Sequence, residues 1–253
     1  MKPFILAETN WKTIKDQKIG LVVLPWGATE AHNYHLPFAT DNLMVEKIAK
    51  DSAQIAWNKG ASVIVLPAIP FGVNTGQLDI RLVINMNPST QLAILNDVVD
   101  VLDRQKINKL LILNGHGGND FKQIIRELGP KYPDVFICAC NWYQSFDGSK
   151  YFKNSGGHAD EMETSVMQFL FPELVLPLDE AGPGRGKKFR IGAFNENWAW
   201  AERKWSKVTS DTGIGDPSEA TPSKGEKCLK EVISKISKLM IDLSAADIEN
   251  MYE

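Results

Sequence analysis

Four short apolar runs, rich in β-branched residues, alternate with longer stretches of helical periodicity along this 253-residue chain. The runs cover residues 19–25, 62–67, 109–114 and 135–141, and the helical stretches between them include residues 42–57, 90–105 and 119–128. Strands that alternate with helices of this length are typical of βαβ units, which join strands in parallel. The pattern therefore predicts an α/β fold with a mostly parallel central sheet. A last apolar stripe in residues 221–243 predicts a closing helix on that sheet.

The composition fits one soluble domain and excludes several classes of partner. Hydrophobic residues make up 43% of the chain, which is enough for one core in a single domain of residues 1–253. The net charge is −3 and the basic residues are dispersed, so we expect no nucleic-acid surface. The first ten residues hold too short an apolar run for a signal peptide or a membrane span. Cys138 and Cys140 alternate in an apolar run, which indicates buried thiols and a reducing, cytoplasmic location.

All four histidines lie in three short segments that are crowded with carboxylates, glycines and asparagines. The first segment places Glu30 and His32 in the loop after residues 19–25, and it ends at Asp41 just before a predicted helix. Open α/β sheets bind ligands at the carboxyl ends of their strands, and side chains two residues apart in an extended loop point the same way. Asp41 could be a plain helix N-cap, but beside Glu30 and His32 we favour a metal ligand.

The second and third segments add further metal-ligating side chains. His116 follows the most hydrophobic run, and the glycines around it leave little bulk to bury it, which favours a metal ligand over a core histidine. His158 precedes three carboxylates, Asp160, Glu161 and Glu163, at the start of a predicted helix. Acidic residues are common in a first helical turn, so we expect only one or two of the three to be functional.

Imidazole and carboxylate are ligands that suit zinc, manganese or iron, and no cysteine belongs to these segments. Four motifs occur in order: LPWGATEAHNYHLPFATD at residues 24–41, NGHGGN at 114–119, HADEMETS at 158–165 and GDPSEA at 215–220. This series resembles the creatininase (creatinine amidohydrolase) family. The resemblance implies a single three-layer α/β/α domain, a dinuclear metal centre, hydrolysis of carbon–nitrogen amide bonds and assembly as a homohexamer. It places metal ligands at Glu30, His32, Asp41 and His116, with Asp41 bridging the two ions.

The fifth ligand is where this sequence departs from creatininase. Creatininase has a glutamate two residues after the motif histidine, and this chain has Gly118 at that position. Family members with the Asn-Gly-His-Gly-Gly-Asn form usually carry a glutamate three residues after the later histidine, which corresponds to Glu161 here. The resemblance therefore favours Glu161 as the fifth ligand, with Glu163 as its main rival.

The resemblance also implies a mechanism. Two divalent ions, with zinc as the first choice and manganese or iron as the others, would hold between them a hydroxide that attacks the amide carbonyl. His158 is the candidate general acid for the leaving nitrogen, because histidine exchanges protons near neutral pH. Glu163 would orient His158 or carry the proton.

Four further residues are candidate substrate contacts. His35 would contact the substrate or brace the first ligand loop. Gln77 stands where many family members have a histidine, so creatinine cannot be assumed as the substrate. Trp142 and Tyr143 follow the last apolar run at its carboxyl end. The basic, tryptophan-rich segment 182–205 is interpreted as a core or assembly surface in preference to a substrate lid.

Three functional classes stay open at this point. The first is a dinuclear amidohydrolase for a small molecule such as a cyclic amide or a formamide. The others are a mononuclear deformylase or peptidase-like hydrolase and a non-catalytic binding or assembly protein of the same fold. The complete ligand set argues against the last class, because unused buried carboxylates would cost folding energy.

Overall fold

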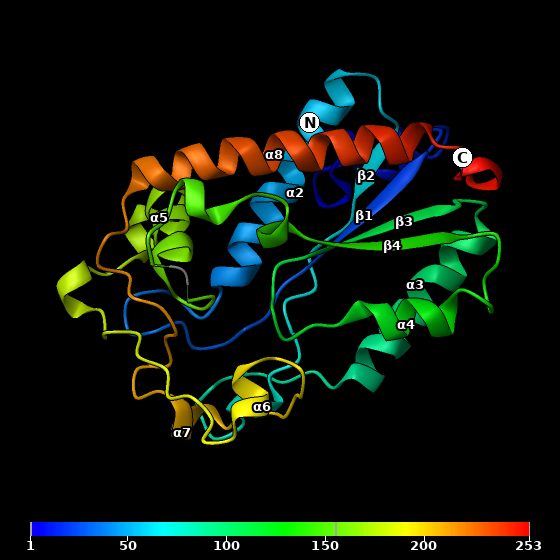
Figure 1. Ribbon diagram of the computed structural model, residues 1–253. Helices are drawn as coiled ribbons and strands as arrows, with labels where there is room; N and C mark the ends of the chain where they lie inside the picture. Colours follow the sequence, from blue (N-terminus) through cyan, green and yellow to red (C-terminus); the bar gives the residue numbers. More distant parts are fainter. Residues whose placement is uncertain (1, 155, 253) are drawn as a thin grey trace.

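The computed structural model describes residues 2–154 and 156–252, and its centre is a parallel four-stranded sheet (Figure 1). The strands are β1 (Leu21–Trp26), β2 (Val63–Val65), β3 (Lys109–Asn114) and β4 (Phe136–Asn141), in the order β2-β1-β3-β4. Val23 of β1 pairs with Val65 on one side and with Leu111 on the other. β1, β2 and β3 are buried along their whole length, as expected for strands covered on both faces. The prediction of an α/β fold with a parallel sheet is confirmed.

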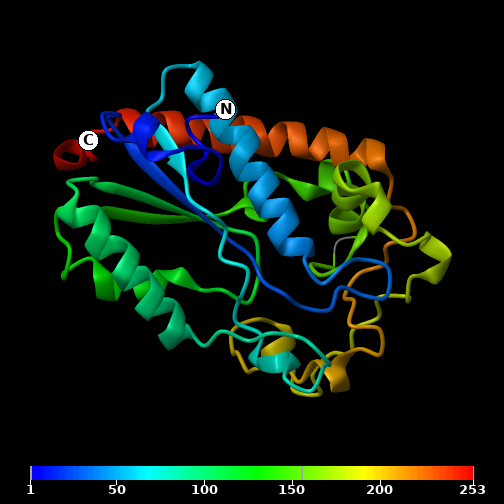
Figure 2. The ribbon, with the colours of Figure 1, turned by 180° about the vertical axis from the view of Figure 1, so that it is seen from behind.

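Helices on both faces of the sheet produce three layers. One face is covered by α2 (Thr40–Asn58), α5 (Glu161–Leu170) and α8 (Pro222–Ala245), and the other by α3 (Pro88–Arg104) and α4 (Phe121–Leu128) (Figures 1 and 2). Successive strand residues enter opposite cores, because strand side chains alternate between faces. Leu21 and Val23 join the core under α2 and α8, whereas Val22 and Leu24 join the core under α3 and α4.

The predicted closing helix is α8. Thr221 caps it by accepting a hydrogen bond from Lys224 N, and Pro222 occupies the first turn, where its missing N–H has no partner to lose. A Cβ at residue 225 would lie 2.0 Å from Ser165 O, so Gly225 lets α8 approach α5 closely. This contact ties the helix that follows His158 to the rest of the fold.

The remaining helices are short. They are α1 (Trp11–Ile14), α6 (Gly192–Asn195), α7 (Trp205–Val208) and 3-10 turns at Leu6–Glu8, Thr75–Gln77, Trp142–Gln144, Gly148–Lys150, Pro172–Leu174, Leu178–Glu180 and Ile248–Asn250. No helix of the described residues is long and apolar enough to cross a membrane. All three cysteines are free, and burial raises the pKa of Cys138 to about 12.

Residues 182–213 form an irregular segment that includes α6 and α7, and we call it the cover segment (Figure 1). Asn33 ties both of its ends to the loop after β1. The Asn33 side chain donates to Gly182 O at 3.0 Å and accepts from Gly182 N at 2.8 Å, while Asn33 N donates to Thr212 Oγ1 at 2.9 Å. Asn33 has φ = 53°, a left-handed conformation that asparagine adopts more readily than most residues.

Candidate metal centre and active site

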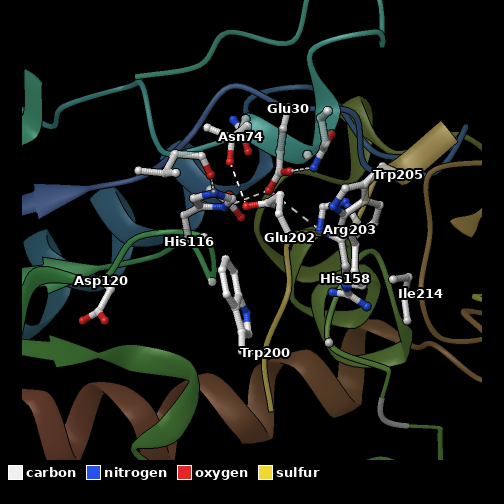
Figure 3. Close-up of a pocket in the computed structure, with 18 of the residues that line it drawn as sticks. Glu30, Asn74, His116, Asp120, His158, Trp200, Glu202, Arg203, Trp205 and Ile214 are labelled. Carbon is white, nitrogen blue, oxygen red and sulfur yellow. Dashed lines mark hydrogen bonds and ion pairs between the residues drawn. The ribbon is translucent and has the colours of Figure 1, made fainter. Parts of the chain in front are cut away.

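The carboxyl ends of β1 and β3 bring the first predicted ligands together. Trp26 and Asn114 are paired at the ends of these strands, so the loop with Glu30 and His32 starts beside the turn with His116. Asp41 lies in the first turn of α2, which follows the first loop. All four ligand side chains are buried. Figure 3 shows Glu30 and His116 at the cavity that opens over this cluster.

Two groups of side chains share Asp41. In the first, His116 Nδ1 lies 2.8 Å from Glu30 Oε1 and 3.0 Å from Asp41 Oδ2. In the second, His32 Nε2 lies 3.2 Å from Asp41 Oδ1 and 3.9 Å from Glu163 Oε2. Within each group the candidate ligand atoms all lie within 4.8 Å of one another. A third group, Glu30 with His32 and His158, overlaps these two, so the cluster holds three overlapping groups of side chains that could bind a cation.

Each of the three imidazoles at the cluster turns one nitrogen toward a backbone carbonyl. His32 Nδ1 lies 3.1 Å from Glu30 O, His116 Nε2 lies 2.9 Å from Val73 O, and His158 Nε2 lies 2.9 Å from Ala31 O. Because a carbonyl only accepts, these nitrogens carry protons, and the other nitrogen of each ring faces the cluster, where a bound cation would take the place of the proton that the carboxylates attract. Asp41 Oδ2 is buried, makes no well-aligned hydrogen bond and lies 3.0 Å from His116 Nδ1. A divalent cation fits this donor set, because it would bind the cluster-facing nitrogens and the carboxylate oxygens together.

The charges of the cluster are strongly coupled. Burial alone would raise the pKa of Glu30 and Asp41, but the neighbouring imidazoles outweigh it and lower both. Burial would lower the pKa of His32, yet Asp41 and the other carboxylates raise it to about 10. Burial raises the pKa of Glu163 to about 8, and Asp41 adds to the effect. Closely packed buried carboxylates of this kind are stabilised by added positive charge, which metal ions supply.

Residues 7–240 match the model of the family Creatininase, described as creatinine amidohydrolase. The chain belongs to the creatininase family. This confirms the resemblance seen in the four motifs. The chain is thus a member of a family of hydrolases described as creatinine amidohydrolases, and it has residue groups that could bind metal.

Several creatininase-family proteins are similar to this chain. A 3-dehydro-scyllo-inosose hydrolase of Thermotoga maritima is 27% identical over 61% of this chain, and the match spans only 51% of that relative's length. A mycofactocin precursor peptide peptidase of Mycobacterium ulcerans is 24% identical over 84% of this chain and 81% of its own. The crystal structure of a candidate creatinine amidohydrolase from Bacteroides fragilis NCTC 9343 is 42% identical over 100% of both chains, with a TM-score of 0.92.

Creatininase structures of lower identity share the fold. One of Zn–Zn type is 19% identical over 97% of this chain and 100% of its own, with a TM-score of 0.78. A manganese form is 18% identical over 96% of this chain and 99% of its own, with a TM-score of 0.76. The three-layer creatininase fold expected from the sequence is confirmed.

Glu161, favoured from the creatininase resemblance as the fifth ligand, lies away from the cluster. Its Oε2 accepts hydrogen bonds from Lys153 N at 2.9 Å and Asn154 N at 2.8 Å, and its Oε1 pairs with Lys224 Nζ. Residues 161 and 163 are separated by about 200° around a helix, so their side chains leave α5 on different sides. Glu163 Oε2 instead accepts a hydrogen bond from Ala159 N at 2.6 Å and lies 3.9 Å from His32 Nε2, at the cluster. The preference for Glu161 over Glu163 therefore needs correction, since spacing from His158 alone did not define the rotation of the helix.

Gly118 occupies the place of the creatininase glutamate, and its surroundings leave no room for a side chain. A Cβ at this position would lie 2.3 Å from Val73 O and 2.4 Å from His116 Nε2. These are the two atoms of the hydrogen bond that orients His116. A glutamate here would require the backbone to move. A carboxylate ligand for the cluster must therefore come from another position of the chain.

Two of the predicted substrate contacts instead support the ligands. His35 is buried, its Nε2 lies 2.8 Å from Thr164 Oγ1, and burial lowers its pKa to about 4. His35 therefore braces α5 against the first loop and does not line the cavity. Gln77 does line the cavity, and its side-chain amide donates to Glu30 Oε2. Gln77 thus holds the carboxylate of a candidate ligand.

The other two predicted contacts do not line the cavity. Trp142 is fully buried in the core and lies parallel to Phe146, because the chain turns into a 3-10 helix directly after β4. Tyr143 packs against the same core. Burial, together with Asp41 and Glu163, raises the pKa of Tyr143 to about 12. Trp142 and Tyr143 therefore lie outside this cavity, and their role in substrate binding stays a prediction.

The cavity has a volume of about 710 Å³, and two distant stretches of chain complete it (Figure 3). Residues 73–76, a polar stretch between glycines after β2, were not singled out from the sequence. The cover segment contributes Trp200, Arg203 and Trp205, although core or assembly was the interpretation favoured for it. The Trp205 ring meets His158 edge-on, with 4.8 Å between ring centroids. The tryptophans and basic residues of this segment were the sequence feature that could have indicated a cavity wall.

A buried amide network positions His116. Asn119 Oδ1 accepts from Val73 N at 3.0 Å and from Gln91 Nε2 at 2.8 Å, while Asn119 Nδ2 donates to Asn114 Oδ1 at 2.9 Å. Val73 O in turn accepts the proton of His116 Nε2. Asn119 therefore fixes the carbonyl that selects the tautomer of His116.

We expect Asn119→Ala to lower the affinity for divalent metal by about 10–100-fold, the usual range for a partner that orients a ligand. Titration of metal-stripped protein with zinc would measure this affinity, with exposed Asn58→Ala as the control. If Asn119 only stabilises the fold, the melting temperature of metal-stripped protein will fall while zinc affinity stays at the wild-type value.

Proposed function

We propose that the chain is a dinuclear metal-dependent amidohydrolase that cleaves a carbon–nitrogen amide bond of a small substrate. Glu30, Asp41 and His116 would hold one ion, and His32, Asp41 and Glu163 the other. The observation that carries this proposal is the shared carboxylate: Asp41 reaches both groups, with Oδ1 3.2 Å from His32 Nε2 and Oδ2 3.0 Å from His116 Nδ1. Zinc is the first choice and manganese or iron the others, because imidazole with carboxylate suits all three.

Divalent ions held by these residues would lower the pKa of a bound water and polarise the amide carbonyl. His158 is the proposed proton carrier. Its Nε2 is engaged with Ala31 O, and its Nδ1 lies 3.8 Å from Glu30 Oε1 at the cavity. In the proposed reaction this nitrogen accepts the proton of the attacking water and returns it to the leaving nitrogen. Trp205 restricts the ring of His158 by its edge-on contact.

The roles of two other residues change in this proposal. Glu163, expected beside His158 as a proton carrier, becomes a ligand because its carboxylate lies with His32 and Asp41. Gln77 becomes a positioning residue because it holds Glu30. In this proposal Glu163 binds metal directly, and Gln77 fixes the position of the ligand Glu30.

Metal content and turnover test the proposal together. Protein purified without chelator should contain two equivalents of divalent metal per chain by mass spectrometry. The metal-loaded enzyme should hydrolyse a member of a panel of creatinine, other cyclic ureides, formamides and small peptide amides. Product formation should disappear in Glu30→Gln. A single equivalent would favour a mononuclear hydrolase, and full turnover by Glu30→Gln would contradict the assignment.

Other features that the resemblance implies stay predictions. We propose that residues 1–253 form one domain, that six copies assemble into a homohexamer and that the enzyme acts in the cytoplasm. Light scattering of the purified protein would test the assembly. The names of the relatives span creatinine, an inosose and a precursor peptide, so they leave the substrate open.

A further inference from the structure

We propose that the active site extends into a second cavity that binds an anionic group of the substrate. This inference rests on the proposed function, and it adds a substrate class. The class consists of amides in which a flat or apolar spacer joins the scissile bond to a terminal carboxylate or phosphate.

The second cavity adjoins the first. It has a volume of about 530 Å³ and lies within the cover segment and its surroundings. Trp200, Ala201, Arg203 and Ile214 line both cavities. Each cavity alone falls in the size range of sites for drug-sized ligands, so together they exceed what a small ring such as creatinine would fill.

The two cavities differ in charge. Lys187, Lys188 and Arg203 line the second cavity, and no aspartate or glutamate is found among its described lining residues. None of these three cations forms an ion pair with another residue of the described chain, whereas Lys204 nearby is paired with Asp79. The first cavity, in contrast, contains five acidic residues: Glu30, Asp41, Asp120, Glu163 and Glu202. Unpaired cations at one end of a divided site attract an anion to that end.

Aromatic side chains line both cavities. Arg203 is placed over the ring of Trp205 at 5.4 Å, and Trp205 meets His158 (Figure 3). Phe189 and Phe194 pack together in the second cavity with 4.9 Å between ring centroids. Such walls bind flat or apolar groups. A substrate amide at His158 would therefore continue past aromatic rings before its anion reaches the lysines.

Hydroxamates test this inference without knowledge of the substrate, because they bind metal centres directly. Acetohydroxamate is the short probe. The extended probes carry a phenyl ring joined to the hydroxamate by methylene chains of increasing length, with a para carboxylate, a para phosphate or a neutral para carboxamide. Calorimetry on the zinc-loaded protein would give the dissociation constants.

We expect the best anionic probe to bind at least about tenfold more tightly than its neutral carboxamide partner, and added salt should reduce the difference. The difference should disappear in Lys187→Gln/Lys188→Gln and persist in Lys207→Gln, an exposed lysine of α7 that lines neither cavity. Preference for the phosphate or the carboxylate would identify the anion.

The outcomes separate the two proposals. If acetohydroxamate binds but the anionic probes gain nothing over the carboxamides, the inference is overturned and the metal centre stands. If acetohydroxamate fails to bind the zinc-loaded protein, the metal centre and the inference both fall. A gain that survives in the double lysine variant would also overturn the inference.

Discussion

Asp41→Asn should abolish dinuclear metal binding and lower turnover by more than about a hundredfold, beyond the loss that follows when only an outer partner of a ligand is removed. Asp41 belongs to both candidate ion sites, with Oδ1 at His32 and Oδ2 at His116. Asparagine has the same shape, but it lacks the negative charge and has only one acceptor oxygen, so it cannot bridge two cations. Metal analysis and turnover of the same preparation would check both effects.

Asp51→Asn is a matched control for this experiment. Asp51 lies on the same helix, α2, but pairs with Lys47 at the surface, where an ion pair contributes little. We expect this variant to keep two metal equivalents and wild-type turnover. If Asp41→Asn kept both ions as well, Asp41 could not be the bridge, and the two groups would have to act as separate sites.

The second large effect concerns the two glutamates of α5. Glu163→Gln should lose about one of two metal equivalents and most of the turnover, because its carboxylate serves the ion site with His32 and Asp41. Glu161→Gln should keep both ions. It should lower the free energy of unfolding by about 1–2 kcal/mol, since it weakens hydrogen bonds to a charged group and the ion pair with half-buried Lys224.

Metal analysis and denaturant unfolding of the two variants would give opposite patterns. Each variant is the control for the other, because both replace a buried glutamate in the first turn of α5 by the same amide. Loss of an ion from Glu161→Gln with full retention in Glu163→Gln would restore the ligand that the sequence resemblance favoured. The corrected assignment would then be wrong.

The sequence predicted the parallel sheet and the gathering of Glu30, His32, Asp41 and His116 for one physical reason. Loops that follow neighbouring parallel strands start at the same edge, so residues far apart in the sequence meet there. The apolar runs predicted the strands, and the polar segments after them predicted which side chains lie at that edge of the sheet.

Other parts of the site depend on rotations and turns that spacing does not encode. The choice between Glu161 and Glu163 depends on how α5 is rotated about its axis. Trp142 follows a strand end as Glu30 does, but a 3-10 turn directs it into the core. Trp205 reaches His158 only through the path of the irregular cover segment, which has no periodicity to predict it.

The attachment of both ends of the cover segment to Asn33 has an evolutionary consequence. Gly182 and Thr212 are hydrogen-bonded to Asn33, the residue next to His32, so the cover segment is a loop that is anchored at both ends. A loop anchored in this way can change its length and side chains without displacing Asn33, since closing a longer loop adds little entropy cost. In the proposed enzyme, the metal cluster and this part of the cavity wall would then lie in separate stretches of the sequence, which can diverge at different rates.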